Sequence, residues 1–362
     1  MIERILAFVL GTCIACWIGA ASAQGYPSRP VRVIVPTPPG GVIDVTTRAI
    51  TPRLSELLGH PFIVENRAGA DTMIGSEMVA RAAPDGYTLL SVFDNFPLSQ
   101  FLFSKVPYDA LKDFAPISLL IRGPMIVAVP QQLGIKDLNR FLELARSKPG
   151  ALNYASAGAG TSSHLTVELF KLTTGIDVQA VHYKGAGPAV SDLLGGHVQL
   201  MIATSGTLLP HARSGRIVPL AVSATGRIPI LPDVPAIAES FPGFDAQSWV
   251  GMLAPAGTSS AIIRQLNAGI AKVLAEPDIR RLFEDQGFEV LGSSAEVFEK
   301  WLATQSEKWG RVIRERKITL GAALDRTQWR QEVAYALAAR PVADKLRRSV
   351  LPHAISADPT FA

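Results

Sequence analysis

The chain has 362 residues, of which 48% are hydrophobic and 18% charged, so it can bury a sizeable core and is neither disordered nor collagen-like. Its 35 Lys and Arg exceed its 31 Asp and Glu by four, and the positive residues are scattered along the chain. This pattern argues against a nucleic-acid groove, although a weakly positive field favours small anions. At roughly 150 residues per domain, the length predicts two domains.

Residues 1–23 have the pattern of a signal peptide. Arg4 closes a short basic segment, an uncharged stretch follows, and a small-x-small cleavage site ends at Ala23. A retained anchor would need about 20 apolar residues and a polar stop. A lipoprotein acylated at Cys13 or Cys16 is the other alternative, but neither cysteine follows a suitable lipobox. We expect export with cleavage after Ala23, and a mature chain without thiol catalysis, cysteine zinc sites or disulfides.

Short β-branched runs alternate with amphipathic helical stretches along most of the chain, beginning with a strand at 31–35 and a helix at 44–58. Such alternation predicts an α/β fold with mostly parallel sheets, helices on both faces, and ligands bound in the loops that follow the strands. Residues 321–362 are interpreted as a C-terminal appendage of unknown role. The other predicted strands are 62–64, 87–93, 125–129, 152–155, 178–183, 198–203, 217–222 and 249–253, and the other helices are 73–83, 138–146, 164–172, 189–194, 261–275, 278–286 and 295–317.

A glycine-rich loop joins the first predicted strand to the first predicted helix. It contains Pro39, Gly40 and Gly41, and Asp44 follows at the start of the helix. Paired glycines let backbone amides approach a ligand, and a helix N-terminus leaves up to four N–H groups unsatisfied. The loop is therefore a candidate carboxylate site, with a simple tight turn as the alternative. Asp44 could contact a donor group of the ligand or stabilise the helix N-terminus electrostatically.

A second loop of the same kind follows the predicted strand at 152–155 and precedes a helix. Its hydroxyls can cap that helix or donate to an anion, and both interpretations stay open. The two loops together predict half-sites on opposite sides of a cleft. The candidate residues of the second loop are Ser156, Ala157, Gly158, Thr161, Ser162, Ser163 and His164.

A third candidate contact is the strand end that contains Tyr183, Lys184 and Gly185. Lys184 offers a charge and Tyr183 an aromatic wall, whereas a solvated strand end is the alternative.

Motifs for metal binding or catalysis are weak. His164 and Glu168 are four residues apart and could share a metal ion, but no third ligand is signalled nearby, so we expect neither a metal nor a cofactor. Ser163 next to His164 is no catalytic dyad, because adjacent side chains on a helix point in different directions. Phosphate-loop, complete dinucleotide-binding and nucleophile-elbow motifs do not occur in the sequence.

Nine short motifs follow one another between residues 26 and 320. No single motif is decisive, but their order and spacing together are specific for one family. They are YPSRPV at 26–31, PGGxxD at 39–44, ENRAGA at 65–70, APDGYTLL at 83–90, DFAPIS at 113–118, LNYASAG at 152–158, HYKG at 182–185, DVP at 233–235 and WVGMLAPAGT at 249–258. With them the chain resembles the Bug-type extracytoplasmic solute receptors of tripartite tricarboxylate transporters.

The resemblance implies a type II periplasmic-binding-protein fold with a ligand enclosed between two lobes. Lobe 1 would comprise 26–123 plus 249–320 and lobe 2 would comprise 124–248, with chain crossings near 122–124 and 247–249. In that family a carboxylate is held by backbone amides and small hydroxyls, often with bridging water. The resemblance thus implies a periplasmic monomer that passes a small carboxylate-bearing solute to membrane transporter subunits.

Three places depart from the family pattern. Asp71 and Thr72 stand where many relatives have glycines, and Thr204 lies where the family often has an Asp. After the predicted strand at 87–93, Asp94 and Asn95 replace small hydroxyl residues. If Asp94 faces the cleft, a ligand with a cationic, amide or hydroxyl donor fits better than a plain tricarboxylate, because an unpaired buried charge is costly.

Two other functions stay open on sequence alone. A ligand-sensing adaptor for a membrane signalling protein would begin with the same ligand closure, so the sequence does not separate it from a transport receptor. An exported enzyme on the same fold would need a nucleophile, a metal triad or a cofactor loop, and the sequence offers none of these.

Overall fold

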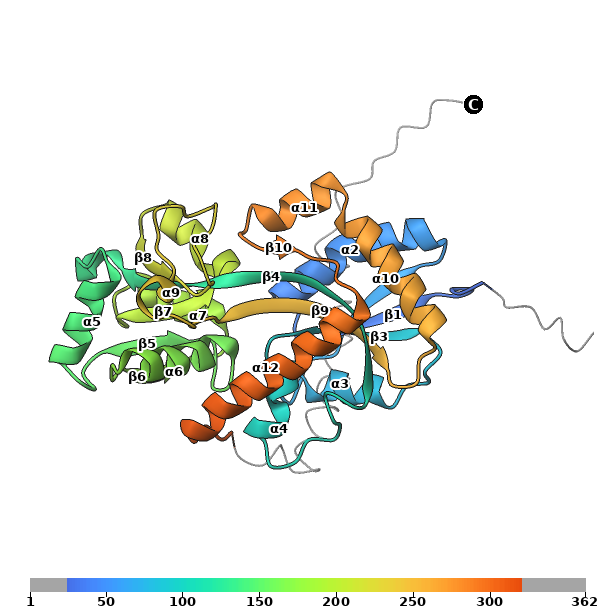
Figure 1. Ribbon diagram of the computed structural model, residues 1–362, viewed down its shortest axis with the longest axis horizontal. Helices are drawn as coiled ribbons and strands as arrows, with labels where there is room; N and C mark the ends of the chain where they lie inside the picture. The colour runs from blue at the N-terminus through green and yellow to red at the C-terminus, as the bar shows by residue number, and fades with distance from the viewer. Residues whose placement is uncertain (1–24, 321–362) are drawn as a thin grey trace, which may run out of the picture.

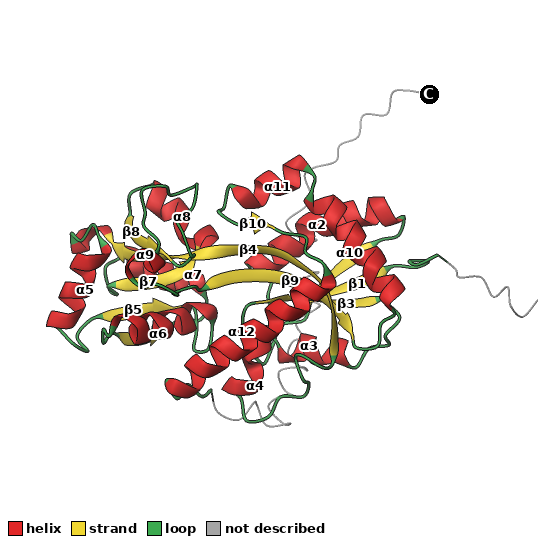
Figure 2. Cartoon of the chain, viewed as in Figure 1, coloured by secondary structure: helices red, strands yellow, loops and turns green. Residues whose placement is uncertain are grey.

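The computed structural model describes residues 25–320, so the predicted signal peptide and the C-terminal appendage lie outside the described residues. The described strands join into one ten-stranded sheet that extends through two halves of the molecule, with helices packed on both faces (Figures 1 and 2). None of the helices in this part of the chain is long and apolar enough to cross a membrane.

The first half is built on β1, which pairs in parallel with β2 and β3. β1 has the sequence VRVIV and its valines are fully buried, as expected for a central strand under helices. Ile50 of α2 and Leu266 of α10 pack against these valines in one core cluster. The bounds are β1 Val31–Val35, α2 Val42–Leu58, β2 Phe62–Asn66, α3 Met73–Ala80, β3 Thr88–Phe93, η1 Phe96–Leu98, α4 Ser99–Leu102, α10 Ser260–Leu274 and α11 Pro277–Glu284.

The second half repeats this arrangement around β5, which pairs in parallel with β6 and β7. Helices connect these parallel strands and pack on the sheet, where they bury a separate core that includes Phe141, Tyr154 and Phe170. The bounds are η2 Gln131–Leu133, α5 Leu138–Ser147, β5 Asn153–Ser156, α6 Ser162–Thr174, β6 Gln179–His182, α7 Ala186–Leu194, β7 Leu200–Thr204, α8 Ser205–Arg213, β8 Ile217–Val222 and α9 Ile237–Ser240.

Two long strands, β4 (Phe114–Pro130) and β9 (Gln247–Pro255), connect the halves (Figure 2). They pair antiparallel with each other, and β4 goes on to pair antiparallel with β7 and β8. The short strand β10 (Glu289–Val290) also pairs with β4. The parallel pairing predicted from sequence therefore occurs among the outer strands of each half, whereas the connecting strands are antiparallel.

The C-terminal helix α12 (Ala295–Glu315) packs against both halves, and Figure 1 shows it lying obliquely across them. Phe298 near its start belongs to a core cluster with Trp249 and residues of the first half. Trp309 and Ile313 near its end belong to the core cluster of the second half. The predicted division places all of 249–320 in lobe 1, and within that range the apolar face of α12 also reaches the core of the second half.

Candidate ligand-binding cleft

A cavity of about 630 Å³ lies between the two halves, beside the connecting strands. Loop 37–41 and the start of α2 form one wall, and the loops that begin α6, α7 and α8 form the opposite wall. Met125 of β4 and Ser248 and Val250 of β9 lie at the wall between them. The predicted half-sites therefore border one cavity.

Four helices start at this cavity, and their N-cap residues Gly41, Thr161, Gly185 and Thr204 all lie on its wall. None of the four caps the N–H groups of its helix with a side chain, and two of them are glycines. Away from the cavity, the side chains of Asp137, Ser259 and Ser294 cap α5, α10 and α12, whereas α3 and α11 have no side-chain cap. The cavity wall therefore offers unsatisfied first-turn N–H groups and the positive ends of four helix dipoles, which suit an anion.

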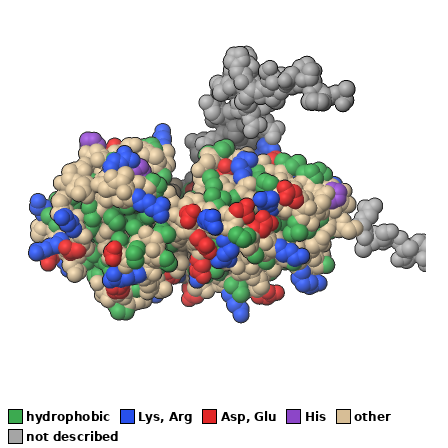
Figure 3. All heavy atoms as spheres, turned by 90° about the horizontal axis from the view of Figure 1, so that it is seen from above, with side chains coloured by type: hydrophobic (Ala, Val, Ile, Leu, Met, Phe, Trp, Pro, Cys, Tyr) green, Lys and Arg blue, Asp and Glu red, His purple; other side chains and the backbone are tan. Residues whose placement is uncertain are grey.

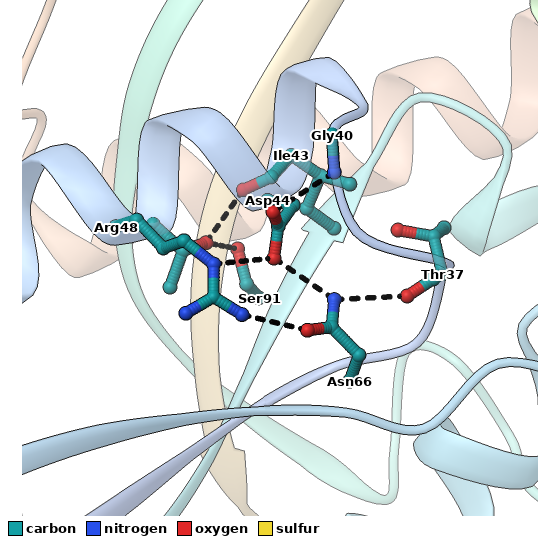
Figure 4. A network of polar contacts seen from close by, with 8 residues as sticks. Thr37, Gly40, Ile43, Asp44, Arg48, Asn66 and Ser91 are labelled. Atoms are coloured by element: carbon teal, nitrogen blue, oxygen red, sulfur yellow. Dashed lines mark hydrogen bonds and ion pairs between the residues drawn. The ribbon is translucent and has the colours of Figure 1, made fainter. Parts of the chain in front are cut away.

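Asp44 is buried at the start of α2, behind the cavity wall, and Figure 4 shows its contacts. Its carboxylate accepts hydrogen bonds from Gly40 N–H at 3.0 Å, Arg48 Nε at 3.0 Å and Asn66 Nδ2 at 2.8 Å. Burial alone raises the pKa of Asp44, and these hydrogen bonds lower it below its ordinary value. Because its acceptor positions are occupied, Asp44 shapes the glycine loop and does not face the ligand space.

The hydroxyls of the second loop are mostly engaged within it. Ser163 Oγ accepts the Ala157 N–H at 2.9 Å, and Thr161 Oγ1 donates to the Gly158 carbonyl at 2.7 Å. Ser162, also on the cavity wall, makes no hydrogen bond with its side chain among the described residues. Of these side chains, that of Ser162 is the one not held within the loop, and its hydroxyl lies near the Asp94 carboxylate on the cavity wall.

Ser156 and His164 lie beneath this loop and outside the cavity wall. The Nδ1 atom of His164 accepts the Gly160 N–H at 2.9 Å. Burial, together with the nearby His182, lowers the pKa of His164 to about 4, which keeps the ring neutral and able to accept this bond. The Ser156 hydroxyl lies 2.7 Å from Nδ1 of His182 and is fully buried. Both side chains support the loop from behind.

We expect Ser162→Ala and Ser163→Ala to act differently. Loss of the Ser162 hydroxyl should weaken carboxylate binding about tenfold, since one hydrogen bond to a charged group contributes about 1.5 kcal/mol. Ser163→Ala leaves the Ala157 N–H unpaired and should lower the free energy of unfolding by about 1–3 kcal/mol. Calorimetric titration and thermal unfolding of both variants measure these effects. The assignment is wrong if Ser163→Ala is fully stable and Ser162→Ala binds like the wild type.

The third predicted contact is only partly at the cavity. Gly185 lies on the wall, whereas Lys184 is exposed and outside it. The Tyr183 hydroxyl donates to Asp192 at 2.5 Å, so this ring ties the loop to α7. Asn95 is buried away from the cavity, with Nδ2 3.5 Å from an oxygen of Asp71.

The structure brings ten of the predicted residues to the cavity wall and leaves the other seven outside it. The wall includes Pro39, Gly40, Gly41, Asp94, Ala157, Thr161, Ser162, Ser163, Gly185 and Thr204, whereas Asp44, Asn95, Ser156, Gly158, His164, Tyr183 and Lys184 lie elsewhere.

The apolar part of the wall was not predicted from the sequence. Phe93, Ile121, Met125, Met201 and Phe288 come from strand interiors and from the turn after α11. In the sequence such residues are indistinguishable from ordinary core residues, so no local signal marks them.

Surface charge on the face drawn in Figure 3 is mixed, with Lys and Arg interspersed among Asp and Glu. Within residues 25–320, no three His, Cys, Asp or Glu side chains lie close enough together to hold a metal ion.

Comparison with known proteins identifies the family. The model of the tripartite tricarboxylate transporter family receptor matches residues 46–318. The chain belongs to this receptor family. The receptor is 37% identical to protein BugT of Bordetella pertussis over 317 residues, which cover 86% of this chain and 97% of BugT.

Solved structures of relatives share the fold. MatC from Rhodopseudomonas palustris, solved with bound malate, is 33% identical, with a TM-score of 0.71, 80% of this chain covered and 100% of MatC. Rpa4515 of R. palustris, solved with adipate, is 32% identical, with a TM-score of 0.73, 80% of this chain covered and 98% of the other. The predicted resemblance and the predicted periplasmic-binding-protein fold are both confirmed.

Proposed function

We propose that the receptor captures a small carboxylate-bearing solute in the cavity between its halves and delivers it to the membrane subunits of a tripartite transporter. The observation that carries this proposal is the convergence of four helix N-termini without side-chain caps on one cavity. Relatives of the same fold support it, since one was solved with malate and another with adipate.

A binding screen tests the proposal. Thermal unfolding of the mature protein is measured with dicarboxylates, tricarboxylates, amino acids and matched uncharged amides. A carboxylate at a hundredfold excess over its Kd should stabilise the protein by about 2.7 kcal/mol, and its amide should not. Native mass spectrometry of protein purified from the periplasm should show the same class of solute. Stabilisation by the amides as strong as by the acids would contradict the proposal.

We infer that the lobes 26–123 plus 249–320 and 124–248 close on the solute by bending near Gly123 and Ser248, which pair with each other in β4 and β9. The end of α12 belongs to the first lobe in this division but packs in the core of the second half, so closure must preserve or rearrange that contact. Small-angle scattering should show a more compact particle with saturating ligand, and size-exclusion chromatography a monomer.

We further infer that the receptor acts by binding and not by catalysis. Ser156 and His182 form the nearest approach to a nucleophile and base, but Ser156 is buried and lies outside the cavity wall. Recovery of the bound solute unchanged after prolonged incubation tests this inference, and conversion of the solute would contradict it.

Export is the fourth part of the proposal, and it rests on the residue pattern before Gln24. Expressed in a Gram-negative host, the mature protein should begin at Gln24 and lack Cys13 and Cys16. Intact-mass measurement of the periplasmic fraction checks this. A periplasmic form that keeps Met1, or that carries a lipid on either cysteine, would contradict it.

A further inference from the structure

Asp94 is an unusual residue in the cavity. It follows the last residue of β3, it is 3% exposed, and it lies on the cavity wall. Neither of its carboxylate oxygens has a hydrogen-bond partner among the described residues. On the described wall it is also the only ionisable side chain, since the other lining residues are apolar or neutral polar.

An arrangement of this kind is unfavourable in the protein alone. A buried carboxylate without a partner loses its hydration and gains nothing in return. The hydroxyls of Ser162 and Ser248 and the Asn95 N–H lie near the carboxylate, but none makes a hydrogen bond of normal geometry with it. A donor group of a bound solute would supply the partner that the described residues do not.

We propose that Asp94 is a specificity-determining residue that binds a protonated amino group of the solute, so that the solute carries an ammonium as well as a carboxylate. This inference rests on the proposed function, because it names which carboxylates the same cavity prefers. An ammonium supplies both the donor and the charge that Asp94 lacks, and a charge-assisted hydrogen bond is about twice as strong as a neutral one.

The position of Asp94 also limits where the amino group lies on the solute. Ser162, beside Asp94, is the first residue of α6, whose N-terminus is one of the four that suit a carboxylate. A solute bound to both must hold its ammonium within a few bonds of a carboxylate. A 2-amino acid has this arrangement, whereas a long-chain amine with a distant carboxylate does not.

The charge state of Asp94 adds a pH dependence. Burial raises the pKa of Asp94 to about 6, and its polar neighbours, Ser248, Ser162 and the Asn95 N–H, lower the pKa only in part. No charged side chain contributes to this pKa, and the nearby acid Asp71 lies behind Asn95. Affinity for an amino-bearing solute should therefore fall as pH drops through about 6, because protonated Asp94 no longer attracts the ammonium.

The test uses matched solutes that differ at one position: succinate, malate and aspartate, and glutarate, 2-hydroxyglutarate and glutamate. Calorimetry at pH 7.5 should show the amino member of at least one series binding tenfold or more tightly than its unsubstituted analogue. Asp94→Asn, which keeps shape but removes charge, should abolish that preference. Asp71→Asn is the matched control, since Asp71 is also mostly buried, with its pKa raised by burial to about 6, but lies outside the cavity wall.

Several outcomes would overturn the inference. Equal affinity for the unsubstituted and amino members in both series would do so, as would a hydroxy acid that binds as tightly as its amino analogue. A third contradicting result is an Asp94→Asn variant that binds every diacid more tightly and keeps the amino preference. It would show that the Asp94 carboxylate competes with the solute carboxylate for the N–H groups at the start of α6. If carboxylates bind without amino preference, only this inference fails. If no carboxylate binds, the proposed function fails.

Discussion

Gly41→Val is expected to weaken carboxylate binding by about 10- to 100-fold. A hydrogen bond from a backbone amide to a carboxylate contributes roughly 1.5–3 kcal/mol, and 1.4 kcal/mol corresponds to a factor of ten. Gly41 is the N-cap of α2, with a φ of −77°, and a Cβ added there meets no atom within 4 Å. The variant should therefore fold normally, while its side chain blocks the approach to the N–H groups of α2.

Calorimetric titration with the tightest carboxylate found in the screen measures this effect. Gly187→Val is the matched control, because Gly187 also lies in the first turn of a helix, has open space around it, and is not on the cavity wall. Lys184→Ala should change affinity less than about fivefold, since an exposed ion pair is worth 0–1 kcal/mol. Unchanged affinity in a natively folded Gly41→Val would move the carboxylate to another loop.

Glu168→Gln is expected to lower the free energy of unfolding by about 3 kcal/mol and Tm by roughly 5–10 °C. Glu168 is buried in α6 and accepts hydrogen bonds from Tyr154 at 2.9 Å, Lys171 at 3.0 Å and Arg316 at 2.7 Å. The substitution to glutamine removes the negative charge that balances the positive charges of Lys171 and Arg316. The loss of stability should lie near the lower end of the range for breaking a buried ion pair, because the Arg316 side chain is one third exposed.

Acid should reduce the difference between Glu168→Gln and the wild type. Burial raises the pKa of Glu168, but the bonds from Lys171 and Arg316 outweigh it and hold the pKa below the ordinary 4.5. Its contribution is thus complete above pH 4.5 and is lost as pH falls through the lower, folded-state value. Urea unfolding from pH 7 to pH 3 measures this. Glu143→Gln, at an exposed pair with Arg140, is the control and should change stability by less than about 1 kcal/mol.

Local sequence signals predict the two loops at the cavity well, because strand-to-helix turns depend on the backbone freedom of glycines and small residues. Glycines at 40 and 41 and the small residues at 157–163 mark strand-to-helix turns, and any such turn places N–H groups after the strand end. The side chains were harder to assign. Asp44, Ser163 and His164 carry the right chemistry, but they bond to Gly40, Ala157 and Gly160 of their own loops. Which way a polar side chain turns depends on packing that spacing along the chain does not reveal.

The connecting strand β4 shows a second limit. Residues 125–129 were predicted as a strand, but 114–124 were not, because Pro116, Gly123 and Pro124 usually interrupt strands. In the structure they lie where β4 shifts register against β9 or passes between the halves. The Cβ of a residue other than glycine at position 123 would come within 2.6 Å of Phe288, so the glycine permits close packing beside the cavity. Breaker residues here mark a bend in a continuous strand.

The placement of α12 has a consequence for how the molecule unfolds. Its first turns complete the core around Trp249, and its last turns complete the core around Phe170, with Arg316 bonded to Glu168. Neither core can open fully without exposing part of the same helix. The two lobes should therefore lose structure together, in one cooperative transition, although each has its own hydrophobic interior. A fragment that contains residues 124–248 alone would lack Trp309, Val312 and Ile313 from its core, so we do not expect it to fold as an independent unit.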